Sequence, residues 1–233
     1  KEEYTLLGHD PNITSLTLIL EFATSPCTTL QELSWWVQTL IAISYEAIPA
    51  DSNTILISTG LNPTQEYLKN LSFGEHHHIL GPNVNRETRI AVYNMIRNYM
   101  PHLIALSVNS PFENKKTTDE VYIDSKGRTR APRCKRSIRL FKNTTQMGPS
   151  SRFEMIPYQE DYDVESFEEH VKRSPPRMVD IFPFTEYETV EVRIFDTQLS
   201  VPRRIGIAMI LQALATKAKK MVENGEKIPD VGA

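Results

Sequence analysis

Cysteine is scarce in this chain: Cys27 and Cys134 are the only two among 233 residues. Two cysteines cannot form the disulfide framework that stabilises small secreted domains, so we expect a reducing, cytoplasmic setting. Long hydrophobic runs are missing as well, because the longest candidate, residues 33–48, is interrupted by Ser, Gln, Thr and Glu. A bilayer-spanning helix needs about 18 or more apolar residues, so we expect no membrane association.

The chain also lacks an excess of positive charge. Its 26 Lys and Arg residues face 29 Asp and Glu residues, which gives a formal net charge of -3. A general nucleic-acid-binding protein is usually strongly basic, so we expect small-molecule partners and no nucleic acid. Hydrophobic residues make up 40% of the chain, which is enough for a core. The length suits one large domain or two small ones, and we expect a single domain over residues 1–233.

Strand and helix signals follow one another without the regular βαβ order of a parallel sheet. Apolar and β-branched runs predict strands at residues 13–22, 54–59, 75–80, 178–184 and 187–196. Apolar spacing and capping residues predict helices between Thr29 and Pro49, from Asn83 or Asn85 to Pro101, over residues 102–112, and from Ser200 to Gly225. The pattern predicts an α+β domain with a largely antiparallel sheet.

Residues 113–152 differ from the rest of the chain because they are polar and crowded with arginine. We interpret them as a long basic arm or loop, which in a compact domain is usually functional or mobile. Arginine forks suit phosphate or carboxylate oxygens, and a solvated charged loop is the alternative. Homo-oligomerisation is left open, since one indole of the Trp35–Trp36 pair could lie at an interface or both could lie in the core.

The strand predicted at residues 187–196 carries a carboxylate and a guanidinium two residues apart. Side chains alternate along a strand, so Val190, Val192 and Ile194 are expected to face the core. The opposite face then carries Thr189, Glu191, Arg193 and Phe195. Such a polar face is either a functional surface or a solvated one. In the second case its surface ion pair contributes about 0 to 1 kcal/mol to stability.

Three consecutive histidines stand in the strand predicted at residues 75–80. His76 and His78 share one face, whereas His77 points away with Glu75 and Ile79. Two imidazoles spaced in this way can bind one metal ion, or they can be satisfied polar residues beside a loop.

Acidic residues from other segments can meet these histidines on one sheet face. Glu21, Glu191 and, from the N-terminal segment, Glu3 or less favourably Glu2 are the candidates. Clustered carboxylates repel one another unless divalent cations neutralise them, and a nucleoside triphosphate can complete the coordination.

Several stretches together resemble glutamate–cysteine ligase family 2. GEHHHI followed by a helix and ALSVNSPF is similar to the family's His-x-His and "ALSxNSPF" stretches. LEFATSPCTTLQEL resembles its "VEIxTxPCxxLxEL" segment, and TVEVRIFDTQ resembles its "TIEIRxxDxQ" strand. The similarities keep the family's order over most of the chain.

The resemblance implies a glutamine synthetase-like catalytic domain, in which helices cover the outer face of a curved sheet and the concave face binds ATP with Mg²⁺ or Mn²⁺. Such enzymes join a carboxylate, usually the glutamate γ-carboxylate, to an amine such as that of cysteine through an acyl phosphate. The implied metal ligands are Glu3, Glu21, His76 and Glu191. The implied cofactor-binding residues are His76, His78, Ser137 and Arg139, and Arg193 acts in catalysis together with Glu191.

Two other functions stay open at this stage. Lys1 stands where the family's first N-terminal acid is expected, which is compatible with a non-catalytic relative that binds a nucleotide or an amino acid. A zinc-dependent hydrolase built around His76 and His78 is the other alternative, although the chain has no HExxH motif.

Overall fold

The computed structural model describes the chain in separate ranges. These are residues 22–53, 55–60, 73–81, 83–110, 165, 180–183, 185, 187–198 and 200–231, together with the backbone of residues 6–7, 19–20, 112–113, 116–117, 122–123 and 129–130. Within these ranges no helix is long and apolar enough to cross a membrane.

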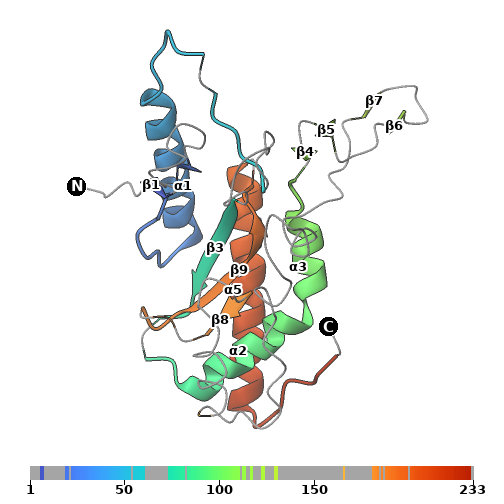
Figure 1. Cartoon of the computed structure of the whole chain (residues 1–233). Coiled ribbons are helices and arrows are strands. Elements are labelled where there is room, and N and C mark those ends of the chain that lie inside the picture. Colours follow the sequence, from blue (N-terminus) through green and yellow to red (C-terminus); the bar gives the residue numbers. More distant parts are fainter. Residues whose placement is uncertain are drawn as a thin grey trace.

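The centre of the described structure is a three-stranded antiparallel sheet in the order β3-β9-β8. Its strands are β3 (Gly74–Ile79), β9 (Val190–Asp196) and β8 (Ile181–Phe182). Figure 1 shows the long helix α5 (Val201–Glu223) running along this sheet, with α2 (Arg86–Asn98) crossing near its lower end. Helices and an antiparallel sheet in one chain confirm the predicted α+β class.

Two helices begin at their predicted capping residues, and α5 ends at the predicted glycine, but the predicted bounds at residues 99–112 are wrong. Helix α2 ends at Asn98 rather than at Pro101, and the helix predicted over residues 102–112 is Met100–Ser107 (α3), with Pro101 in its first turn. The Thr29 side chain accepts a hydrogen bond from the backbone N–H of Glu32 at 3.1 Å and starts α1 (Leu30–Glu46). Asn85 starts α2 in the same way, with Thr88 N–H donating at 2.8 Å. Gly225 follows α5 with a φ of +72°, a left-handed conformation that glycine adopts without a Cβ penalty.

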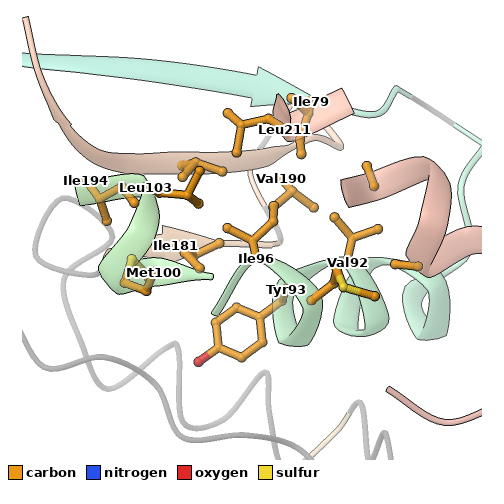
Figure 2. Packing of buried hydrophobic residues seen from close by; sticks show 14 of the residues in the cluster. Ile79, Val92, Tyr93, Ile96, Met100, Leu103, Ile181, Val190, Ile194 and Leu211 are labelled. Atoms are coloured by element: carbon orange, nitrogen blue, oxygen red, sulfur yellow. The ribbon is translucent and has the colours of Figure 1, made fainter. Parts of the chain in front are cut away.

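Helix α2 supplies more residues to the buried core cluster than any other described element. Ile90, Val92, Tyr93 and Ile96 are completely buried against the sheet and against α5. The short helix α3 (Met100–Ser107) continues the same layer, and Figure 2 shows side chains of both helices packed against those of β8 and β9. The buried side chains of β9 belong to the same cluster as those of both helices, so close packing fixes the position of the strand.

The strand predicted at residues 54–59 is wrong, and the one predicted at residues 13–22 is described only in part. Residues 55–59 form no strand, and Ile55 and Ile57 are 79% and 52% exposed. Their β-branched composition favours a strand, but here the backbone runs irregularly, tied by side chains rather than by a neighbouring strand. Of residues 13–22, only Ile19–Leu20 (β2) is a strand within the described ranges, paired antiparallel with Leu6–Leu7 (β1).

The segment predicted as a basic arm contains paired backbone where it is described. Phe112–Glu113 (β4) pairs with Lys116–Thr117 (β5), and Tyr122–Ile123 (β6) pairs with Thr129–Arg130 (β7). The remaining residues of the segment lie outside the described ranges. These two short antiparallel pairs are compatible with an arm, and the assignment of residues 113–152 as a basic arm or loop stays a prediction.

Candidate functional site

The central strand β9 changes face along its length because of a β-bulge. Glu75 lies opposite Phe195, but His77 lies opposite Val192, so β9 takes one extra residue between these pairs. Phe195 consequently lies on the core side, fully buried, with its ring 5.2 Å from that of His77. The prediction that Phe195 shares a face with Glu191 is wrong for this reason.

Glu191 is the centre of the candidate site. Its Oε1 atom lies 3.3 Å from Nδ1 of His76 and 3.8 Å from Nε2 of His78, and it accepts a hydrogen bond from Arg193. The outer two histidines thus share a face with Glu191 and Arg193, as the alternation predicts. Strand pairing explains this, because His78 lies directly opposite Glu191 in the β3–β9 ladder.

The electrostatics of this cluster keep Glu191 ionised. Burial raises the pKa of the Glu191 carboxyl, but the hydrogen bond from His76 and the positive charge of Arg193 more than compensate, so the pKa lies below its ordinary value. Burial lowers the pKa of His78, with Glu191 acting in the opposite direction, and the net shift is downward. The site therefore presents an anion, a cation and a neutral imidazole at neutral pH.

One carboxylate oxygen of Glu191 stays available to a ligand. All contacts of Glu191 in the described part of the chain converge on Oε1, and Oε2 has no hydrogen bond or ion pair there. A carboxylate with two imidazoles is a donor set that suits Zn²⁺, Mn²⁺ or Fe²⁺, whereas carboxylates with only one imidazole are compatible with Mg²⁺ or Mn²⁺. However, no group of three or more His, Cys, Asp or Glu side chains within the described ranges is arranged to hold a metal ion. Glu191 and His76 fit as part of such a site, and further acids are needed to complete it.

The predicted partners Glu3, Glu21, Ser137 and Arg139 lie outside the described residues. Whether the fold brings them to Glu191 stays a prediction.

The opposite face of β3 carries a second ionic cluster, which sequence reasoning missed. His77 Nε2 lies 3.0 Å from Oε1 of Glu75, and Oε2 of Glu75 lies 3.5 Å from Arg204 of α5. Burial raises the pKa of Glu75, but the hydrogen bond and charge of His77, together with Arg204, lower it below the ordinary value. This cluster joins β3 to α5 beneath the site. The prediction that His77 points away from the outer histidines is confirmed.

Two of the stretches that carry the family resemblance meet at the end of β9. Oδ2 of the fully buried Asp196 accepts hydrogen bonds from Asn109 N–H at 2.8 Å and from the Ser110 hydroxyl at 2.7 Å. Asn109 also donates through Nδ2 to the carbonyl of Thr197 at 2.6 Å. Gly60 completes the junction, because its N–H donates to the Asn109 carbonyl at 2.8 Å. The ALSVNSPF and DTQ stretches thus form a buried framework that fixes β9.

Comparison with known proteins agrees with these motifs. The model of "Glutamate-cysteine ligase family 2(GCS2)" matches residues 62–227. A protein of Gloeobacter violaceus named "Putative glutamate--cysteine ligase 2" is 31% identical over 158 residues, which cover 67% of this chain and 38% of that protein. One of the same name from Herpetosiphon aurantiacus is 33% identical over 149 residues, or 63% of this chain and 34% of that protein.

Legionella pneumophila (strain Corby) has a similar protein, named "Putative glutamate--cysteine ligase 2-2". It is 31% identical over 163 residues, which are 67% of this chain and 38% of the relative. The matched region thus spans less than two fifths of each of these relatives. The family model nevertheless matches well over half of this chain, and it includes β3, α2, α3, β9 and α5. The chain belongs to glutamate–cysteine ligase family 2.

Proposed function

We propose that this chain carries the catalytic surface of an ATP-dependent ligase that joins a carboxylate to an amine. The carboxylate is the γ-carboxylate of glutamate and the amine is that of cysteine. The observation that supports this most directly is the arrangement of Glu191, whose Oε1 is held by His76, His78 and Arg193 while Oε2 has no partner among the described residues. Family membership favours a ligase over a zinc hydrolase for the same residues.

The reaction we propose has two steps. The substrate carboxylate attacks the γ-phosphorus of ATP, the bond to the bridging oxygen breaks, and ADP leaves. The amine then attacks the acyl phosphate, loses a proton, and expels inorganic phosphate to leave an amide. Divalent ions, when bound, supply charge neutralisation at the phosphate oxygens.

Each described side chain has a role in this proposal. Glu191 and His76 contribute ligands for the cation, together with Glu3 and Glu21. Arg193 offers a fixed guanidinium, already aligned by Glu191, to the negative charge on the phosphoryl group. His78 contacts the nucleotide from the same face, with Ser137 and Arg139 contributing beyond the described residues.

The test is ADP release from purified protein with ATP, glutamate, cysteine and Mg²⁺ or Mn²⁺, with γ-glutamylcysteine identified by mass spectrometry. Glu191→Gln keeps the size of the side chain but removes its charge, and we expect a loss of about 100-fold or more in ADP release. Glu46→Gln makes the same chemical change at an exposed position at the end of α1 and should leave the rate unchanged.

A panel of other amino acids in place of glutamate and cysteine covers a different substrate pair. Absence of ADP release across the whole panel, with ATP binding retained, would favour the non-catalytic alternative. Equal rates for Glu191→Gln and wild type would refute the assignment of the site.

A further inference from the structure

His78 is held by contacts on both sides of its ring, although its side chain is 40% exposed. Its Nδ1 atom lies 2.7 Å from the hydroxyl oxygen of Thr189, which precedes β9. The ring of Tyr187 meets it edge-on, with centroids 5.9 Å apart and an angle of 76° between the planes. An exposed histidine on a strand would ordinarily sample several rotamers, so these contacts restrict it.

Thr189 is itself clamped by Thr185. The Thr189 N–H donates to the Thr185 hydroxyl at 3.0 Å, the two hydroxyls are 2.8 Å apart, and the Thr185 hydroxyl donates to the Thr189 carbonyl at 3.1 Å. Glu188, within the turn, has a φ of +55°, which is unfavourable for a residue with a Cβ. The Thr185 side chain thus makes three hydrogen bonds that close a strained turn, and they fix the Thr189 hydroxyl that contacts His78.

Only one placement of the protons gives each of these four contacts a hydrogen, because a Thr185 hydroxyl that donated to the Thr189 hydroxyl would leave its 3.1 Å contact with the Thr189 carbonyl without one. The Thr185 hydroxyl has one hydrogen, which goes to the Thr189 carbonyl, and its lone pairs accept from the N–H and the hydroxyl of Thr189. The Thr189 oxygen then has only lone pairs left for His78, so Nδ1 of His78 must carry the hydrogen. The opposite nitrogen, Nε2, keeps a lone pair. Its separation of 3.8 Å from Glu191 Oε1 is too long for a hydrogen bond, which agrees with two acceptors facing each other.

We propose that Thr189, held by Thr185, is a positioning residue that fixes His78 in the Nδ1–H tautomer and turns the Nε2 lone pair toward Glu191. In that state Nε2 and Glu191 together present two acceptors to a cation or to a donor group of the substrate. The use of Nε2 by a ligand rests on the proposed function, whereas the tautomer does not. Hydrogen bonds from the remote nitrogen commonly orient ligating imidazoles in this way.

The experiment is two-bond ¹⁵N–¹H correlation NMR on the whole chain labelled with ¹⁵N-histidine, at a pH where the ring is neutral. His78→Gln identifies the His78 signals. We expect wild type to show a protonated Nδ1 and an unprotonated Nε2. Thr189→Val, which keeps the branched shape without the hydroxyl, should release the ring into a mixture of tautomers, and Thr189→Ser should restore the wild-type pattern.

A second readout uses Mn²⁺ alone and follows the paramagnetic broadening of the same ring signals. We expect Thr189→Val to weaken Mn²⁺ binding about tenfold, and Thr189→Ser to bind as wild type does. Wild type with its proton on Nε2 would overturn the inference, whatever the variants do, and this result needs no substitution that could disturb folding. Wild type with the expected tautomer but no Mn²⁺ binding and no ADP release would instead count against the proposed function and leave the role of Thr189 standing.

Discussion

Among the glycines in the described part of the chain, Gly60 is the one at which an added methyl group should destabilise the fold most. A Cβ at this position would lie 2.4 Å from Cγ of Asp196 and 2.5 Å from the Ser110 hydroxyl oxygen. Real Cβ atoms do not approach heavy atoms so closely, and Asp196 cannot move away because it is fully buried and hydrogen-bonded to Asn109 and Ser110. Gly60→Ala therefore forces the framework at the end of β9 to shift.

The magnitude follows from two costs and one gain. Overpacking a buried site costs about 1 to 3 kcal/mol, and losing one hydrogen bond to a buried carboxylate costs about 1.5 to 3 kcal/mol. Alanine in place of glycine restricts the unfolded chain, which returns about 0.4 to 1 kcal/mol. We expect Gly60→Ala to lower the free energy of unfolding by about 3 kcal/mol, a large share of the roughly 5 to 15 kcal/mol of a typical domain.

The assay is urea unfolding followed by far-ultraviolet circular dichroism. Gly206→Ala is the matched control, since no atom lies within 4 Å of a Cβ built there and the residue is inside α5. The control should raise the free energy of unfolding by about 0.5 to 1 kcal/mol. A Gly60→Ala protein that unfolds within about 0.5 kcal/mol of wild type would show that the framework is not packed as described.

Two further predictions concern the faces of β3. Gly74→Ala places a Cβ 2.8 Å from Nε2 of His76, which is the far end of a movable side chain. We therefore expect a free energy of unfolding within about 1 kcal/mol of wild type, but slower ADP release because the imidazole turns away from Glu191. An equal loss of stability in Gly74→Ala and Gly60→Ala would contradict this prediction. The folded-state pKa of Glu75 lies below its ordinary value of 4.5, so its contribution to stability is complete above that value and is lost as the pH falls through the folded pKa. Unfolding measured across this acid range should therefore show the advantage of wild type over Glu75→Gln shrinking as the pH falls, and a constant difference would refute the assignment.

Features encoded within one turn or one strand could be predicted from the sequence. The capping residues Thr29 and Asn85 act on backbone groups three positions away, so the starts of α1 and α2 are visible locally. The alternation of β3 and β9 is also local, and it correctly placed the outer histidines with Glu191 and Arg193. The ligase chemistry expected of these positions came from the family resemblance and not from the alternation.

Features that depend on distant partners could not be predicted in the same way. The bulge that turns Phe195 into the core arises from the register between two strands that are more than 100 residues apart in the chain. The framework around Asp196 requires that residues 60, 109, 110 and 196 meet, and only the similarity of ALSVNSPF and DTQ to family stretches pointed to their importance. The strand prediction at residues 55–59 was wrong for a related reason. Strand propensity does not by itself produce a strand, because a strand also needs a neighbour to pair with.

The histidine triplet shows how the same kind of side chain differs in its surroundings on the two faces of β3. Both faces of β3 pair histidine with glutamate, but the His77 and Glu75 side chains are 12% and 9% exposed, and Arg204 occupies the second oxygen of Glu75. Each charged side chain in that cluster is paired with another side chain of the protein. A ligand would therefore have to displace a buried partner, at a high cost in free energy. On the outer face the His76 and His78 side chains are 32% and 40% exposed, and Oε2 of Glu191 has no partner among the described side chains. Only this face can take up a ligand without first breaking the fold, which is why the proposed chemistry belongs to Glu191 and the outer imidazoles.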